Sequence, residues 1–385
     1  MNPVIKTLQR QGFWKRPDHT TYSGAQAVGL IVVAIVWLVM PEVIFILRQE
    51  TNFFTIMRNL AEIFTFGIVV PQASIFLSHR VLLECTYTEV QSTLDTIAMD
   101  SNKDVQRILK GLNKFSDRIF KGYIGGEAFV AIPYFLSVPF TVVFKYLYTG
   151  VLPALRGILE SDYFLFDYQA NIRVWSIVTV LNSIVIIYCV SFFISSHSFY
   201  WSLLNNVSGL FEIISLKIHC LNEITEESLH RKRLAEIIEV QEVAYRSARA
   251  LEKSLNVFVL ILYGMCIFNV CMTMVILSFP NSDQDLLFKM LLLLVYLLFH
   301  IFVYSMLGTE LMSTSAATAD AFYATHWYMR SVNEQRLILF ALARSQKMAT
   351  LTTGKYFEVG RNTFGMALQT SMSYFAVLRQ VYSNK

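Results

Sequence analysis

The sequence predicts an all-α integral membrane protein with seven transmembrane helices, and three observations lead to this prediction. Of the 385 residues, 55% are hydrophobic and only 16% are charged, whereas a soluble protein keeps about a quarter of its residues charged. Seven segments are apolar enough to cross a bilayer, for which roughly 20 residues are needed. The Lys and Arg residues gather in alternate segments between these stretches, as basic residues do on the cytoplasmic side of a membrane.

The seven expected spans differ in how clearly their composition marks them. The first, fifth and sixth are almost entirely apolar, the second and third contain Glu62 and Glu127, and the seventh is short and the most polar. In chain order, the expected spans are residues 25–47, 54–78, 124–146, 174–200, 255–279, 286–308 and 363–382.

The distribution of basic residues sets the expected orientation. Residues 1–24, 79–123, 201–254 and 309–362 hold 24 of the 32 Lys and Arg residues. By the positive-inside rule these segments are cytoplasmic. The N-terminus is therefore expected in the cytoplasm and, after seven spans, the C-terminus outside the cell. This orientation is the reverse of that of a G-protein-coupled receptor.

Three of the cytoplasmic segments are expected to be helical. Residues 221–255 carry apolar side chains at three- and four-residue spacing with charges between them, which indicates an amphipathic helix continuous with the fifth span. Residues 101–122 follow the same pattern and lead into the third span. Residues 310–346 form another helical stretch that ends near a loop-like segment. Such extensions are more often packing surfaces than catalytic ones, so we expect a cytoplasmic helical anchor region.

The loop at residues 147–173 is the only sizeable segment expected outside the cell. Its aromatic residues could form an interfacial belt, which we favour, or a lid over a pocket. These aromatic residues are Tyr163, Phe164, Phe166 and Tyr168.

No motif in the sequence indicates an enzyme or a metal site. Patterns such as HExxH, GxSxG, a Walker loop or CxxC are absent, and the seven histidines do not cluster at ligand spacing. The five cysteines are too scattered for a disulfide framework, and the net charge of +4 does not indicate nucleic-acid binding. We therefore expect no enzymatic activity, no cofactor, no metal and no nucleic-acid partner, with membrane lipid around the spans.

Four ionisable residues inside the expected spans are informative, because charge is costly in lipid. Glu127 and Lys289 lie near span ends and are expected to reach the interface by snorkelling. Glu62 and His300 lie deeper and are expected to face protein or a wet cavity. A ligand site and structural hydrogen bonds are equally good interpretations of these residues.

A dispersed motif runs through the last fifth of the chain. It consists of Glu310-Leu311, Ser313, Ala321 to Tyr323, Trp327-Tyr328, Arg344-Ser345-Gln346, Leu351 to Lys355, Phe357, Thr363-Phe364, Ser373-Tyr374-Phe375 and Leu378-Arg379-Gln380. This pattern resembles the C-terminal signature of the insect odorant receptors, a family of seven-span proteins with inverted topology. The remainder of the chain agrees with that family in length, number of spans and orientation.

The resemblance implies a ligand-gated, non-selective cation channel in the plasma membrane of a sensory neuron dendrite. Family members assemble as tetramers whose seventh helices line a central pore and whose cytoplasmic ends form an anchor. This chain lacks the longer second cytoplasmic loop of the shared odorant co-receptor, so it resembles an odorant-tuning subunit that needs the co-receptor in a heterotetramer. Residues 1–308 would then form a six-helix ligand-binding region, and residues 309–385 an anchor segment with the pore helix.

The seventh span is expected to carry the gate of this channel. Val377 and Val381 lie four residues apart, hence on one helix face, and four such faces around an axis would form an apolar constriction that closes by dewetting. The resemblance matches Val377 and Val381 to the gate positions of the family and Gln380 to a polar pore residue. Arg379 stands where the co-receptor has an apolar residue, which favours few copies of this chain per tetramer. Packing against lipid or a neighbouring helix is the alternative for this face.

The resemblance also places a ligand site in the outer half of the membrane, among the second, third, fourth and sixth spans. The residues available there are mostly apolar or aromatic, with a few hydroxyl and amide groups, which suits a small volatile ligand of low polarity. Plain core packing is the alternative for each of them. The candidates are Phe64, Thr65, Ile68, Tyr134, Phe135, Val138, Asn182, Ile186, Leu292 and Tyr296.

Three other classes of membrane protein are alternatives to this interpretation. A gustatory-type channel that forms homotetramers is the main alternative, because Tyr374 and Gln380 keep the Tyr–Gln spacing of that related family. Val381 replaces its Phe, however, which favours the odorant branch. A G-protein-coupled receptor is disfavoured by the orientation, and a transporter by the lack of an internal repeat.

Overall fold

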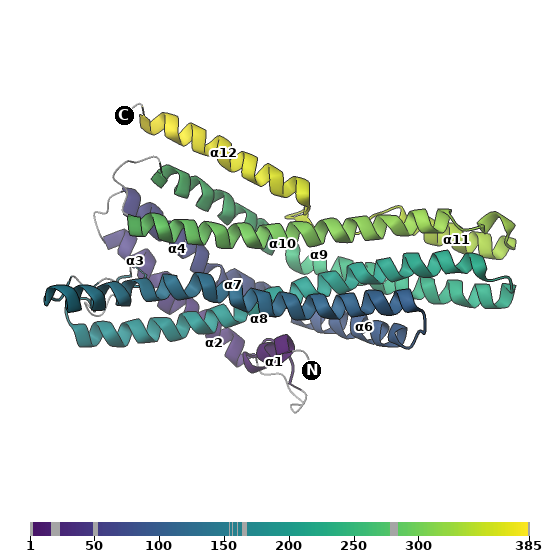
Figure 1. Ribbon diagram of the computed structural model, residues 1–385, viewed down its shortest axis with the longest axis horizontal. Coiled ribbons are helices and arrows are strands. Elements are labelled where there is room, and N and C mark those ends of the chain that lie inside the picture. Colours follow the sequence, from purple (N-terminus) through teal and green to yellow (C-terminus); the bar gives the residue numbers. More distant parts are fainter. Residues whose placement is uncertain are drawn as a thin grey trace.

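The chain forms an elongated bundle built around four long helices (Figure 1). The computed structural model describes residues 3–16, 24–48, 53–153, 155, 157–159, 161–163, 168–277 and 284–383. The long helices are α7 (Lys103–Thr149), α8 (Ile172–Cys220), α9 (Glu227–Leu277) and α10 (Gln284–Tyr323). Helix α8 packs against the other three and is buried almost continuously from Phe192 to Ile214, so it forms the centre of the bundle.

The long helices extend well beyond the thickness of a bilayer. At about 1.5 Å per residue, the 47 residues of α7 span about 70 Å, more than twice the hydrocarbon core of about 30 Å. The expected helical extensions at 101–122 and 221–255 are confirmed, because α7 begins at Lys103 and α9 at Glu227 and both continue unbroken through the apolar segments that follow.

The N-terminal third of the chain packs along α8 and α9. Its elements are α1 (Pro3–Arg10), α2 (Ala25–Val33), the π-helix η1 (Ala34–Val39), α3 (Met40–Arg48), α4 (Phe53–Gly67), α5 (Val69–Ser78) and α6 (Arg80–Ala98). The short amphipathic α1 buries Val4, Ile5 and Leu8 against α8. Helix α6 follows α5 after one residue, His79, and continues the second span as a helix that the sequence patterns did not indicate.

The first span contains a π-helical segment just before a proline. A proline inside an α-helix has no N–H to donate, and its ring clashes with the carbonyl four residues earlier, which for Pro41 is that of Trp37. Trp37 lies within η1. The wider turn of a π-helix can accommodate a carbonyl that has lost its usual donor. Trp37 faces α8 from this segment, and its indole N–H donates to Asn182 at 2.7 Å.

The segment at 310–346 is not one helical stretch, in contrast to the expectation. Helix α10 ends at Tyr323, a 3-10 turn η3 (Trp327–Met329) follows, and α11 (Val332–Ser345) runs separately. The break is fixed by hydrogen bonds to the 3-10 turn η2 (Leu221–Glu223) and the residues after it. The backbone N–H of His326 donates to Asn222 at 2.9 Å, and the Arg330 guanidinium donates to the Ile224 carbonyl at 2.9 Å.

A small β-hairpin connects α11 to the C-terminal helix. Its strands are β1 (Thr352–Thr353) and β2 (Phe357–Glu358), and α12 (Arg361–Ser383) follows. Gly354 and Lys355 both have positive φ in the turn, a backbone conformation that glycine adopts without strain. The Gly354 N–H donates to the Asn256 carbonyl of α9 at 2.9 Å, so the hairpin is held on α9 at the point where the chain enters α12.

Six helical segments among the described residues are long and apolar enough to cross a membrane. They coincide with the first six expected spans, whereas α12 covers the seventh and is more polar. The chain is therefore a helical membrane protein, and a seventh span along α12 stays a prediction. Figure 1 shows α12 lying obliquely along one side of the bundle, with its start at the hairpin.

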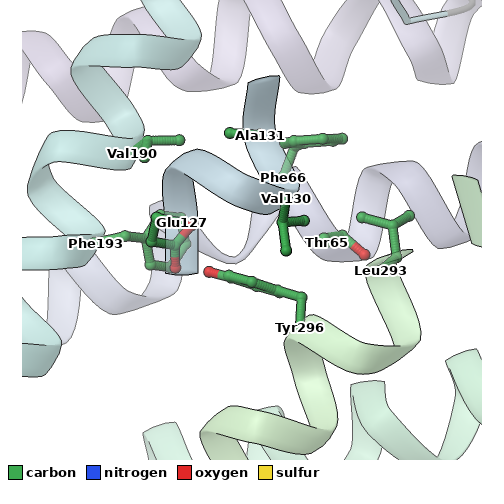
Figure 2. Close-up of a pocket in the computed structure, with 9 residues that line it drawn as sticks. All are labelled: Thr65, Phe66, Glu127, Val130, Ala131, Val190, Phe193, Leu293 and Tyr296. Atoms are coloured by element: carbon green, nitrogen blue, oxygen red, sulfur yellow. The ribbon is translucent and has the colours of Figure 1, made fainter. Parts of the chain in front are cut away.

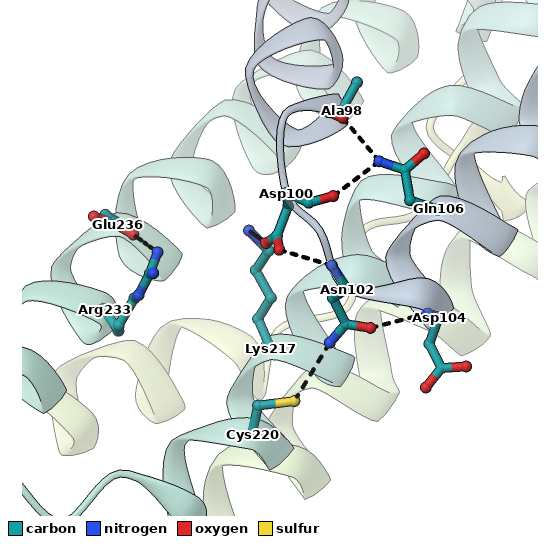
Figure 3. Close-up of polar contacts among 9 residues, drawn as sticks. All are labelled: Ala98, Asp100, Asn102, Asp104, Gln106, Lys217, Cys220, Arg233 and Glu236. Carbon is teal, nitrogen blue, oxygen red and sulfur yellow. Dashed lines mark hydrogen bonds and ion pairs between the residues drawn. The ribbon is translucent and has the colours of Figure 1, made fainter.

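Polar contacts fix the turn between α6 and α7 (Figure 3). Asn102 caps α7 by accepting from the Asp104 N–H at 2.9 Å, and the Gln106 amide donates to the Ala98 and Asp100 carbonyls. The Lys217 ammonium of α8 contacts the Asp100 carboxylate at 3.0 Å and is the main reason why the pKa of Asp100 lies below its usual value. The turn that begins α7 is therefore attached to α8.

Candidate functional site

A small cavity lies between α4, α7, α8 and α10, about midway along the bundle. Its volume is about 50 Å³, enough for one or two waters but far below the 300–1,000 Å³ of a typical ligand site. A ligand would therefore have to displace the side chains that line it. These are Thr65, Phe66, Glu127, Val130, Ala131, Val190, Phe193, Leu293 and Tyr296 (Figure 2).

Three polar side chains interrupt the apolar lining. Glu127 is only 6% exposed, and its Oε1 atom has no hydrogen-bond partner among the described residues. The Thr65 hydroxyl donates to the Ala61 carbonyl of its own helix at 2.7 Å. Figure 2 shows the hydroxyl of Tyr296 pointing toward the Glu127 carboxylate.

A buried network of aromatic and histidine side chains continues from the cavity along α10. His300 Nδ1 lies 2.8 Å from the Tyr296 carbonyl, which only accepts, so Nδ1 carries the hydrogen. In the neutral ring Nε2 is then the acceptor, and the Tyr123 hydroxyl donates to it at 2.6 Å. The Glu127 carboxylate lies 3.9 Å from the same Nε2. The network thus connects the cavity to the core around His197, whose ring lies 4.6 Å from that of His300.

The structure brings two of the ten candidate ligand residues to the cavity, namely Thr65 and Tyr296. Ile68 and Ile186 are buried in the main hydrophobic core and do not line the cavity. Leu292 is half-buried, while its neighbour Leu293 lines the cavity, which corresponds to one residue, or about 100°, of helix rotation.

The other candidates lie away from the cavity or outside the described part of the chain. Phe64 is 42% exposed and packs on Phe268, with ring centroids 5.0 Å apart. Val138 packs in a second cluster near the outer loop, which includes Trp175. Tyr134 and Phe135 belong to α7, but their side chains lie outside the described residues.

Asn182 joins three elements at the end of the bundle near the outer loop. Its side-chain oxygen accepts from the Trp37 indole of η1 at 2.7 Å and from the Tyr163 hydroxyl at 2.8 Å. Tyr168 is also buried, in the cluster around Trp175. Tyr163 and Tyr168 therefore pack into the protein rather than in a surface belt, while Phe164 and Phe166 lie outside the described residues.

Replacing Asn182 by leucine is expected to destabilise the protein, because the Trp37 and Tyr163 donors lose their shared acceptor. Each buried donor left without a partner costs about 1–3 kcal/mol. Thermal unfolding in detergent should show a lower midpoint for Asn182→Leu and a smaller decrease for Tyr163→Phe, which removes one donor together with its bond. An Asn182→Leu protein of unchanged stability but altered ligand response would instead indicate that Asn182 contacts ligand.

Glu127 was expected near the membrane interface, but it is buried and lines the cavity. The expected snorkelling is wrong, because α7 extends about seven turns before Glu127 and buries its carboxylate against α10. Its spacing to Tyr123, Val130 and Ala131 is that of one helix face, a signal that could have located it. The expectation that Glu62 and His300 face protein is confirmed, since both are at most 1% exposed.

The candidate gate lies on α12, whose buried residues among the described side chains share one face. Thr363, Ala367 and Ser371 are buried and share the face of α12 that lies against α9 and α10. Val377 is 59% exposed and Gln380 is exposed in the single chain. The side chain of Val381 lies outside the described residues.

A family model described as 7tm Odorant receptor matches residues 102–372, more than two thirds of the chain. The chain belongs to the odorant receptor family. The match includes α7 to α11, the hairpin and half of α12, so it extends far beyond the C-terminal motif. The receptor is thus a transmembrane protein of olfaction and not a member of an enzyme family.

Individual relatives support this assignment over shorter stretches. The receptor is 25% identical over 150 residues to Odorant receptor 85b of Drosophila melanogaster and 26% identical over 149 residues to Odorant receptor 22c of the same fly. These alignments cover 39% of this chain and 38% and 37% of the two relatives. The receptor therefore spans less than two fifths of the length of the curated relatives that it matches.

Solved structures show the same fold over almost the whole receptor. The insect olfactory receptor OR5 from Machilis hrabei superposes with a TM-score of 0.78 at 14% identity, covering 98% of this chain and 97% of that one. The structure of OR5 in complex with eugenol gives a TM-score of 0.74 at 15% identity and the same coverage. At this level of identity the likeness concerns the fold alone.

Proposed function

We propose that this receptor is the odorant-sensing subunit of a heteromeric, ligand-gated, non-selective cation channel. A small volatile ligand binds in the cavity between α4, α7, α8 and α10 and opens the pore. The observation that carries this proposal is a mainly apolar cavity between four helices of a membrane protein of the odorant receptor family. The complex of OR5, a protein of the same fold, with eugenol supports a small organic ligand.

The proposed membrane arrangement follows the charge distribution. The N-terminus lies in the cytoplasm, α12 forms the seventh span, and the C-terminus lies outside. Helices α6 and α11, the hairpin and the adjoining ends of α7 to α10 form the cytoplasmic anchor. Residues 1–308 then hold the ligand-binding region, and residues 309–385 the last anchor segment and the pore helix, in the plasma membrane of a sensory dendrite.

One helix offers a physical connection between cavity and pore. Helix α10 carries Leu293 and Tyr296 in the cavity, and further along it Gly308 touches Val359 just before α12. At the next residue, the Thr309 hydroxyl accepts from the Arg361 N–H at 3.0 Å. A ligand that binds better when α10 is displaced would shift the start of α12 with it, since a ligand moves an equilibrium only by its differential affinity for the two states.

The exposed face of α12 is the proposed pore lining. Val377 and Gln380 are exposed in the single chain, and with Val381 they would face the axis of a tetramer. Co-receptor subunits supply the other faces, which limits the number of Arg379 side chains near the conduction path. The family match over residues 102–372 supports the odorant branch over the gustatory alternative.

Whole-cell current during a panel of small volatiles tests this function. Cells should express the receptor alone or together with an odorant co-receptor, and a C-terminal epitope tag should be labelled on intact cells. Current that appears only with both subunits, together with surface labelling of the tag, is the expected result. Current from the receptor alone would indicate the homotetrameric alternative, and silence with both subunits at the surface would overturn the proposal.

A further inference from the structure

One carboxylate, that of Glu127, interrupts the apolar lining of the cavity. Glu127 is buried among apolar side chains, lines the cavity, and has one oxygen without a hydrogen-bond partner among the described residues. A buried polar atom left in this condition is destabilising. The cavity that the Glu127 side chain lines has space for a water, and a ligand whose polar group lies beside the carboxylate must replace the hydrogen bond that such a water would donate.

The surrounding groups leave mainly lone pairs for a ligand. The Thr65 hydroxyl uses its hydrogen on the Ala61 carbonyl, so it presents an acceptor to the cavity. His300 Nε2 accepts from Tyr123 and therefore offers no hydrogen to Glu127. The Tyr296 hydroxyl points toward Glu127 (Figure 2). Tyr296 is thus the one donor among these polar groups, and acceptors otherwise predominate, while the remaining lining is apolar.

We propose that the cavity selects small apolar ligands whose polar group is a hydrogen-bond donor, a hydroxyl or an amine, and that Glu127 accepts this bond. The proposal rests on the proposed function and adds the chemical class of the ligand. An alcohol or phenol can donate to the Glu127 carboxylate, whereas the corresponding methyl ether has the same skeleton but no hydrogen to donate to it. Discrimination at such a site comes largely from the unpaired group in the protein.

Matched pairs of probes test the selectivity. Eugenol with methyl eugenol, and 1-octanol with 1-methoxyoctane, differ in each case by one methylated hydroxyl, and 1-octylamine supplies the amine. Dose–response curves are measured as current with the co-receptor present. In the wild type, each hydroxyl compound should be at least about tenfold more potent than its ether, as expected for a hydrogen bond to a carboxylate. The relative potency of octylamine and octanol distinguishes an ionised from a neutral donor.

Two substitutions of Glu127 assign the effect to this side chain. Glu127→Leu should bring the potency ratio of each pair close to one. Glu127→Gln keeps the size and adds an amide donor, so the ethers should become relatively more potent. Glu62→Gln is the matched control, because Glu62 is another buried carboxylate of the bundle that does not line the cavity. It should leave both ratios unchanged.

The outcomes separate this inference from the proposed function. Robust currents with equal potency within each pair in the wild type would overturn the donor selectivity and leave the channel function intact. Ratios that persist in Glu127→Leu would also overturn it. If the wild type gives no current with any probe while both subunits are at the surface, the channel function is overturned, and the inference with it.

Discussion

Replacing Gly308 by alanine should remove most of the receptor from the cell surface and abolish ligand-evoked current. A Cβ atom at this position would overlap the carbonyl oxygen of Val359. That backbone has little freedom to move, because the Val359 N–H donates to Leu351 at 2.8 Å and the hairpin is bound to α9. Overpacking of this kind costs typically about 1–3 kcal/mol, which is a large part of the stability of a native protein.

The measurement is surface biotinylation together with thermal unfolding in detergent. Gly111→Ala is the matched control, since nothing lies within 4 Å of a Cβ at Gly111 in α7, and alanine has a higher helix propensity than glycine. It should be neutral or slightly stabilising. A Gly308→Ala receptor with normal surface level, stability and current would show that α10 and the start of α12 need not touch.

Replacing Val377 by threonine should raise the current that flows without ligand. Threonine has nearly the shape of valine, but its hydroxyl makes the constriction to which this residue contributes easier to hydrate, and an apolar constriction closes by excluding water. A change of about 1 kcal/mol in favour of the open state raises the open-to-closed ratio about fivefold. Basal current, normalised to the amount of receptor at the surface, measures this ratio.

The control for Val377 lies on the same helix and points elsewhere. Met372 is 52% exposed and, at about 100° per residue, lies about 140° around α12 from Val377. Met372→Thr should leave the basal current unchanged. Equal basal currents in wild type, Val377→Thr and Met372→Thr would place Val377 in contact with lipid or a neighbouring helix, the alternative that its exposure in the single chain also allows.

The local sequence predicted the membrane helices and the family with little ambiguity. The first six expected spans coincide with apolar helical segments, and the pattern at 101–122 and 221–255 identified the extensions of α7 and α9. The break at η3 and the helix α6 were not predicted. The break depends on hydrogen bonds to Asn222 and Ile224, about a hundred residues away, which no local pattern contains.

The ligand site depended on information that the sequence alone did not provide. Membrane partition sums hydropathy over about 20 residues and is insensitive to how a helix is turned about its axis. Lining a cavity depends on that rotation, so Leu293 rather than Leu292 reaches the cavity and Asn182 connects η1 to the outer loop.

Glu127 shows the same division most clearly. The sequence by itself determined that a carboxylate stands within an apolar helix of a membrane receptor. Only the tertiary structure decided that this carboxylate faces a cavity beside Tyr296 and His300. The physical reason is that an ionisable residue within an apolar span can be recognised from the span's own sequence, because charge is costly in lipid. The partners of that residue, however, are set by how four separate helices pack against one another.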